Sequence, residues 1–191
     1  GFVVVIIDYR LVPEVEYPGF LEDCAAGVVW TVDHIAQYGG DPSRLALMGH
    51  SAGAYNAVML FLAERFLPAM GLADRVKAFV GLSGPYDFYP FDVAVSIRAF
   101  GAVADPKSTQ PVNLARPGLP PAFLATGDAD TMVYSRNTVA LAARLRATGN
   151  TVVETHYAGI GHPGTLLALG AFGRHRAPIL RDVVAFLKAH L

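Results

Sequence analysis

A short glycine-rich stretch, Gly49-His50-Ser51-Ala52-Gly53, carries the clearest chemical signal in the chain. It follows an apolar run typical of a buried strand and precedes small residues typical of a helix. In such a sharp strand-to-helix turn the glycines relieve steric clashes, and the serine Oγ stands exposed above the sheet. We therefore predict that Ser51 is a nucleophile, and that the N–H of Ala52 stabilises the oxyanion that its attack creates.

A serine hydroxyl needs a neighbouring base, and His162 is the best placed of the six histidines. It lies in the glycine-rich loop of residues 159–164, just past the last expected strand. His50 lies inside the turn that carries Ser51, where we expect a structural role. The other histidines fall in expected helices and strands or near the terminal helix: His34, His156, His175 and His190.

The acid that orients the base should follow the strand at residues 122–126, where the sequence reads Gly127-Asp128-Ala129-Asp130. An aspartate here would accept a hydrogen bond from imidazole Nδ1–H and fix the tautomer. Asp130 fits a G-x-x-D spacing and is preferred. Asp128 is more typical of a residue that caps a loop, and Asp87, after another strand, remains a third candidate.

Strands and helices are expected to alternate along the chain. The expected strands are residues 2–7, 44–48, 76–82, 122–126 and 151–157. The expected helices are one that begins near Pro18 and ends before Gly39, and residues 52–66, 135–148 and 178–190. This order predicts an α/β fold, with a mostly parallel sheet, helices on both of its faces, and an active site at the carboxyl ends of the strands.

Composition excludes several classes of partner. The formal net charge of −1 gives no reason to expect nucleic acid. No apolar run approaches the roughly 20 residues of a membrane span. Cys24 is the only cysteine, so an intrachain disulfide is excluded, and we expect a cytoplasmic protein. No metal-ligand spacing is present, so neither a metal nor another cofactor is expected. The oligomeric state is left open.

Several segments resemble the carboxylesterase-like α/β-hydrolases, near the hormone-sensitive lipase, kynurenine formamidase and ferulic acid esterase-like branches. The resemblance rests on DYRL at residues 8–11, GGDPSR at 39–44, GHSAG at 49–53, GDAD at 127–130 and YAGIGH at 157–162. It runs over nearly the whole chain. In these enzymes the serine of the turn, the aspartate of the G-x-x-D segment and the loop histidine form a triad, which implies Ser51, Asp130 and His162.

The resemblance also implies that the chain is truncated at its N-terminus. In the family, a His-Gly-Gly-Gly-type loop precedes the segment that matches residues 2–11, and its N–H groups complete the oxyanion hole. A further strand separates the strands that match residues 2–7 and 44–48. We therefore expect residues 1–191 to be a single domain, the C-terminal part of an α/β-hydrolase lacking the N-terminal strands, with a lid-like insertion around residues 85–120.

The expected activity is cleavage of a small carboxylic ester through an acyl-enzyme on Ser51. An arylformamidase or a small peptidase would use the same triad, and a non-catalytic truncated hydrolase domain is a different interpretation. The region of residues 85–116 either lines an acyl pocket or packs as a lid, through its aromatic residues Tyr86, Phe88, Tyr89, Phe91 and Phe100.

Overall fold

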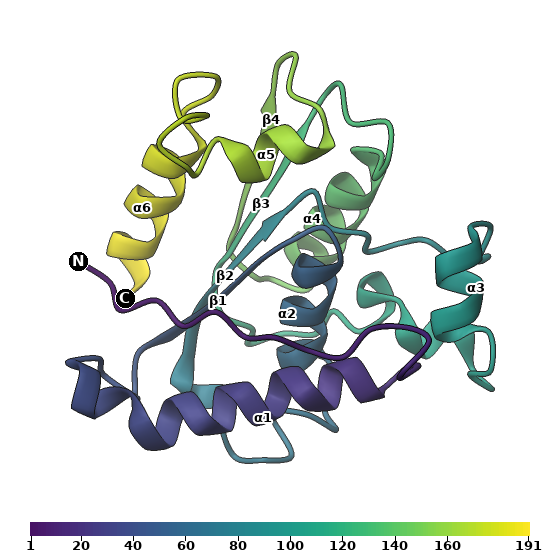
Figure 1. Cartoon of the computed structure of the whole chain (residues 1–191), viewed down its shortest axis with the longest axis horizontal. Helices are drawn as coiled ribbons and strands as arrows, with labels where there is room; N and C mark the ends of the chain where they lie inside the picture. The colour runs from purple at the N-terminus through teal and green to yellow at the C-terminus, as the bar shows by residue number, and fades with distance from the viewer.

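Four parallel strands form the sheet of the computed structural model, which describes residues 1–191 (Figure 1). The strands are β1 (Leu45–His50), β2 (Val76–Leu82), β3 (Ala122–Gly127) and β4 (Val152–Tyr157). They lie side by side in the order β1-β2-β3-β4, and every pairing is parallel. The carboxyl ends of all four strands therefore meet at one border of the sheet, and the predicted α/β class is confirmed.

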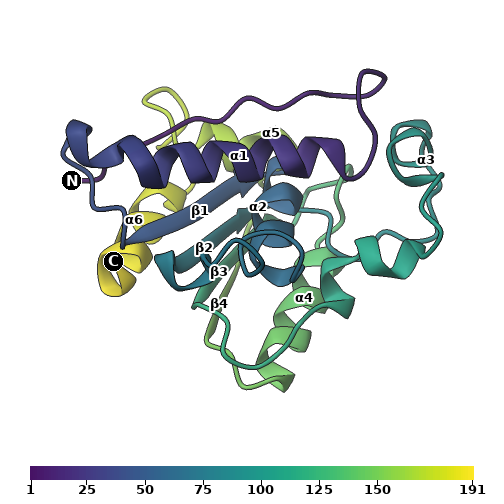
Figure 2. The same ribbon diagram turned by 90° about the horizontal axis from the view of Figure 1, so that it is seen from below.

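Helices cover both faces of the sheet (Figures 1 and 2). The α-helices are α1 (Gly19–His34), α2 (Ala52–Leu62), α3 (Ala94–Phe100), α4 (Arg136–Ala147), α5 (His162–Leu167) and α6 (Ile179–His190). Short 3₁₀ turns are η1 (Ile35–Tyr38), η2 (Ala73–Arg75), η3 (Pro106–Thr109) and η4 (Pro111–Asn113). None of the helices combines the length and apolar composition that crossing a membrane requires.

The period-two alternation of side chains along β2 builds a separate core on each face. Phe79 belongs to the larger core, which contains α1, α2 and α4. Ala78 and Val80, its neighbours in sequence, belong to the smaller core, which contains α6. Because both faces of β2 are buried, the strand is apolar almost throughout, as its sequence predicts.

The sequence places most elements closely, and the differences lie at their ends. The strand predicted at residues 76–82 is β2 itself, and α4 and α6 match their predicted ranges to within one residue at each end. The helix predicted at residues 52–66 is shorter, because α2 ends at Leu62 and turns follow. The stretch of residues 85–120 contains only short helical pieces.

The strand predicted at residues 2–7 is wrong. This N-terminal segment is extended but belongs to no sheet, and it crosses in front of the molecule as a separate trace (Figure 1). A strand needs a partner for its backbone groups, and β1 pairs only with β2. Val4 and Ile6 are consequently 76% and 89% exposed. Instead of sheet hydrogen bonds, Arg10 anchors the segment, with its Nη2 2.8 Å from Oδ1 of Asp23 on α1.

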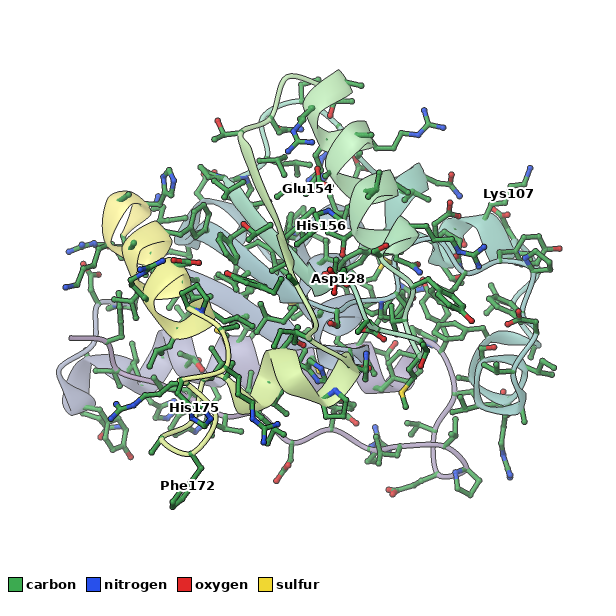
Figure 3. The ribbon with its side chains drawn as sticks, turned by 90° about the horizontal axis from the view of Figure 1, so that it is seen from above. Lys107, Asp128, Glu154, His156, Phe172 and His175 are labelled. Atoms are coloured by element: carbon green, nitrogen blue, oxygen red, sulfur yellow. The ribbon has the colours of Figure 1, made fainter.

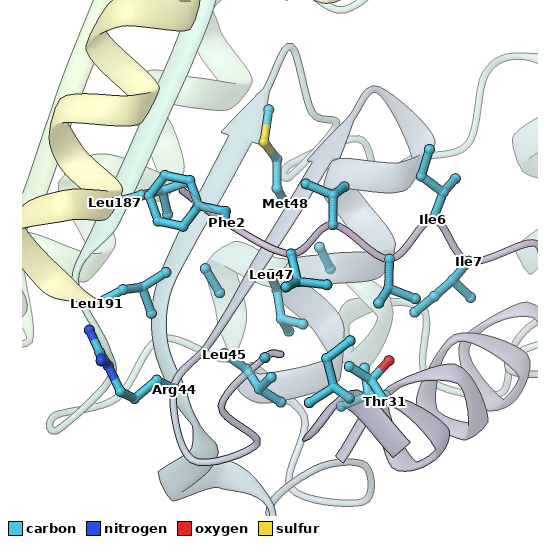
Figure 4. A pocket seen from close by; sticks show the side chains of 18 of the residues that line it. Phe2, Ile6, Ile7, Thr31, Arg44, Leu45, Leu47, Met48, Leu187 and Leu191 are labelled. Carbon is cyan, nitrogen blue, oxygen red and sulfur yellow. The ribbon is translucent and has the colours of Figure 1, made fainter. Parts of the chain in front are cut away.

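An apolar cavity of about 980 Å³ lies along the free edge of β1 (Figure 4). Phe2 and Ile7 of the N-terminal segment line it together with Leu45 and Leu47 of β1 and Leu187 of α6. Ser51, the predicted nucleophile, does not line it. The cavity is therefore a feature of the sheet edge, and it reaches the turn that carries Ser51 only at Gly53.

The aromatic residues of the 85–116 region pack mainly on one another. The Phe100 ring lies 5.3 Å from Phe88, 5.5 Å from Phe91 and 5.5 Å from Tyr55 of α2, measured between ring centroids. Tyr86 is fully buried. Of the two interpretations of this region, the structure favours packing for Tyr86, Phe88, Phe91 and Phe100, whereas Tyr89 is exposed.

Candidate active site

Ser51 occupies a strained turn between β1 and α2. Its backbone angles are φ 54° and ψ −124°, a conformation that side-chain-bearing residues rarely adopt. Its N–H donates to the carbonyl of Leu82 at the end of β2, with 2.9 Å between nitrogen and oxygen. A Cβ at Gly49 would overlap the backbone of Gly53, whereas a Cβ at Gly53 would meet nothing. The turn thus requires glycine sterically at Gly49, while Gly53 leaves open space.

The side chains of Ser51, His162 and Asp130 form one continuous hydrogen-bonded chain. His162 Nε2 lies 2.8 Å from Ser51 Oγ, and His162 Nδ1 lies 2.8 Å from Asp130 Oδ2. A carboxylate only accepts hydrogen bonds, so Nδ1 carries the proton and the neutral ring accepts the Ser51 hydroxyl proton at Nε2. Ser51 and His162 are 111 positions apart in the chain, and His162 and Asp130 are 32 positions apart, so the fold brings distant residues into contact.

Asp130 is held in its ionised form. Its side chain is buried, and its Oδ1 accepts hydrogen bonds from the N–H groups of Val133 at 2.9 Å and Met132 at 3.0 Å. Burial raises the pKa of Asp130, but the Val133 N–H, the His162 side chain and the Met132 N–H outweigh burial and lower the pKa below its ordinary value. Asp130 therefore presents a charged oxygen to the imidazole.

The other two candidate acids do not contact a histidine. Asp128 accepts a hydrogen bond from Gly159 N–H at 2.6 Å and so caps the loop after β4. Asp87 is exposed, and its backbone N–H donates to Asn137 Oδ1 at 2.9 Å. Of the three aspartates proposed from the sequence, the structure brings only Asp130 to His162.

None of the remaining histidines is hydrogen-bonded to the Ser51 side chain. His156 points from β4 toward Glu154, with 3.0 Å between Nε2 and Oε1, and His175 lies on the loop before α6 (Figure 3). His34 bonds to the Trp30 carbonyl within α1. The ring centroid of His50 lies 4.7 Å from that of His162.

His162 is also held through its own backbone, which sequence reasoning missed. It is the first residue of α5 and not part of an irregular loop, and the Pro163 that follows is a helix-start signal that could have indicated this. Its carbonyl oxygen lies 2.9 Å from His50 Nε2 and 3.0 Å from Thr165 Oγ1. No pattern in the sequence links these groups.

Ala52 is the first residue of α2, so its N–H has no partner within the helix and points toward the end where Ser51 lies. This is a suitable position for a donor to an oxyanion. No group of three or more His, Cys, Asp or Glu side chains is arranged to hold a metal ion.

A family model described as BD-FAE matches residues 1–145. The chain is 30% identical to the Mycobacterium tuberculosis esterase LipQ, across 81% of this chain and 40% of LipQ. It is 34% identical to the M. tuberculosis carboxylesterase NlhH, across 68% of this chain and 47% of NlhH. The chain thus spans less than half the length of these relatives.

Solved structures share the fold. A truncated carbohydrate esterase from gut microbiota superimposes with a TM-score of 0.80 at 19% identity, across 95% of this chain and 72% of that one. The carboxylesterase EstE1, cloned from a metagenomic library, gives a TM-score of 0.75 at 23% identity, across 96% of this chain and 68% of EstE1. The family model shows that the chain belongs to the BD-FAE family, and together with the sequence relatives it places the chain within the carboxylesterase-like α/β-hydrolases.

Proposed function

We propose that the protein is a serine hydrolase that cleaves a small carboxylic ester through an acyl-enzyme on Ser51. The observation that carries this proposal is the unbroken hydrogen-bonded chain from Asp130 through His162 to Ser51. The relatives named esterase and carboxylesterase support the choice of substrate class.

The reaction begins when Ser51 Oγ attacks the ester carbonyl and passes its proton to His162 Nε2. Asp130, already ionised, stabilises the imidazolium that forms. Negative charge develops on the carbonyl oxygen, where the N–H of Ala52 donates a hydrogen bond. This arrangement lowers the barrier because the donor and the carboxylate are in place before the charge appears.

Collapse of the tetrahedral intermediate breaks the bond to the leaving alcohol. His162 gives its proton to that alcohol oxygen, and the acyl group remains on Ser51. A water molecule then loses a proton to His162 and attacks the acyl carbon, which releases the carboxylic acid and restores the serine hydroxyl. Each proton leaves or returns through Nε2, the nitrogen that faces Ser51.

The test is labelling by a fluorophosphonate together with hydrolysis of p-nitrophenyl acetate and butyrate. We expect wild-type protein to be labelled at Ser51, and Ser51→Ala to lose labelling and about 10⁶-fold in kcat. Ser43→Ala, which changes an exposed serine before β1, is the matched control and keeps both. If the protein is labelled but does not hydrolyse either ester, the proposed substrate changes from an ester to an amide, as for an arylformamidase or a small peptidase. A folded protein that is not labelled would overturn the hydrolase proposal.

A further inference from the structure

The backbone carbonyl of His162 is the meeting point of a second hydrogen-bond network. Besides His50 and Thr165, this network includes Ser83, whose Oγ lies 3.0 Å from Thr165 Oγ1. Ser83 and Thr165 are completely buried, so both hydroxyls depend on partners within the protein. His50 and His162 are 112 positions apart in the chain, and Ser83 and Thr165 are 82 positions apart.

The direction of each hydrogen bond in this network is fixed by chemistry. A carbonyl oxygen only accepts, so Thr165 donates its hydroxyl proton to His162 and must itself accept from Ser83. For the same reason His50 carries its proton on Nε2. Two donors, one from the turn that carries Ser51 and one from α5, therefore converge on a single backbone oxygen.

We propose that His50, Thr165 and Ser83 are positioning residues that fix the backbone of His162, so that the base is held at its carbonyl as well as at its imidazole. This inference rests on the proposed function, because it assigns the three residues to the alignment of its base. Each of the four strands then positions one residue of the combined network. His50 ends β1, Ser83 follows β2, Asp130 follows β3, and His162 follows β4.

The local chain around His162 gives a reason why such anchoring is needed. Residues 159–164 include three glycines, and Gly159 has a φ of +70°. Glycine permits many backbone conformations, and α5, only six residues long, is too short to be stable by itself. A misplacement of about 1 Å at a reacting group can cost about 100-fold in rate. Asp128 and the N–H of Ala129 hold the start of this segment at Gly159 and Ile160, and the bonds to the carbonyl restrain the backbone of His162 itself.

His50 is suited to this role because it stays neutral beside a base that becomes charged. Burial lowers the pKa of His50, and the nearby His162 lowers it further, although the bond to the His162 carbonyl and the charge of Asp130 act in the opposite direction. A neutral His50 still donates from Nε2. It adds no positive charge next to the imidazolium that forms on His162 during the reaction.

Two pairs of variants separate positioning from mere packing. His50→Leu removes the donor, whereas His50→Gln keeps an N–H near the place of Nε2. Thr165→Val removes the hydroxyl at nearly constant shape, and Thr165→Ser keeps it. We expect His50→Leu and Thr165→Val to lower kcat by about 10- to 100-fold with KM changed less than about 2-fold, and the Gln and Ser variants to recover most of that loss.

Matched controls come from α1. His34 bonds to the Trp30 carbonyl at 2.8 Å, and Thr31 bonds to the Gly27 carbonyl at 2.8 Å, so both bonds are made within α1. His34→Leu and Thr31→Val therefore remove the same kinds of bond without touching His162, and kcat should stay within about 2-fold of wild type. Urea unfolding of every variant shows whether a loss of rate is a loss of fold.

A spectroscopic readout keeps the test independent of turnover. The low-field proton resonance of His162 Nδ1–H, bonded to Asp130, should broaden or exchange faster in His50→Leu and Thr165→Val and recover in His50→Gln and Thr165→Ser. Wild-type protein that is not labelled at Ser51 refutes the proposed function, while this resonance still decides the positioning. Unchanged kcat and resonance in both donor-removing variants, or Gln and Ser variants as impaired as them, would overturn the inference.

Discussion

The carboxyl end and the outer edge of β1 belong to one strand and differ sharply. At the carboxyl end, His50 and Ser51 bond to a buried histidine, and that histidine bonds to a buried aspartate. Along the outer edge, β1 has no partner strand and borders an apolar cavity beside residues 2–6, which are exposed, and Ile7, which is half-buried. The carboxyl end of β1 is therefore joined by hydrogen bonds to the residues around His162. The outer edge of β1, by contrast, has no neighbouring strand to accept or donate its backbone hydrogen bonds.

The bonds that position the site residues are different from the contacts that cover the outer edge of β1. Ser51 is held by β2 through its N–H, and Asp130 by its own loop, so the geometry of the site is fixed by strand ends and the loops between them. None of these bonds passes through residues 2–7. The three side chains are therefore joined to one another without any hydrogen bond to the segment at the outer edge of β1.

After loss of Ser51 itself, the largest effect should come from Asp130→Asn, which breaks the hydrogen bond to His162 at the carboxyl end of the sheet. An asparagine can present its amide NH₂ to Nδ1 and so favour the wrong imidazole tautomer, in which Nε2 carries the proton and cannot accept one from Ser51. We expect kcat for p-nitrophenyl butyrate to fall by about 10⁴-fold while the fold survives. Steady-state kinetics on the purified variant measure this directly.

Asp87→Asn is the control for that prediction, because Asp87 is exposed and contacts no histidine. It should retain wild-type kcat, and Asp128→Asn should lose far less activity than Asp130→Asn. A loss of about 10⁴-fold in Asp128→Asn with little loss in Asp130→Asn would move the acid to Asp128 and contradict the geometry described above.

A second prediction compares the centre of the sheet with its edge through stability. Phe79 on β2 is fully buried, with its ring centroid 5.3 Å from that of Phe61, so Phe79→Ala should lower the free energy of unfolding by about 3–5 kcal/mol. Ile6 is 89% exposed, so Ile6→Ala should change it by less than about 0.5 kcal/mol. Urea denaturation gives both values. A large loss in Ile6→Ala would mean that the Ile6 side chain is packed in solution.

Much of the site could be predicted from the sequence because each of its residues lies in a short motif at the end of a strand. The turn around Ser51 needs glycine at Gly49, and the aspartate and histidine follow strands whose carboxyl ends share one border. Parallel topology then brings the loops together, whatever their separation in the chain. The acid–base pair of Asp130 and His162 follows from that rule, together with the G-x-x-D spacing.

What could not be predicted depends on partners that no local pattern reveals. Residues 2–7 have the β-branched composition of a strand, yet pairing requires a neighbour, and composition does not supply one. The bonds of Thr165 and Ser83 join a buried backbone oxygen to hydroxyls from distant elements, and serine and threonine are too common for their positions to signal this. The expected clash at Gly53 is also missing, because its surroundings are open.

The smallest predicted effect concerns pH, and it compares two aspartates whose pKa values are both lowered. On α1, the hydrogen bonds from Arg10 lower the pKa of Asp23 at the protein surface. At the site, Asp130 is buried, and the bonds from Val133 N–H, the His162 side chain and Met132 N–H outweigh the opposing effect of burial. A carboxyl whose pKa is lower in the folded state stabilises the fold above its unfolded pKa, about 4, and loses that contribution as the pH falls through the folded pKa.

Unfolding free energies of Asp23→Asn and Asp130→Asn, measured from about pH 6 down to about pH 3, should therefore depend less on pH than those of wild type. At about 1 M salt, where screening acts over roughly 3 Å, the difference between Asp23→Asn and wild type should shrink, because its pair with Arg10 faces solvent. The difference for Asp130→Asn should persist, since buried hydrogen bonds are screened far less. Equal loss of both differences in salt would show that the Asp130 site is as open to water as the Arg10–Asp23 pair.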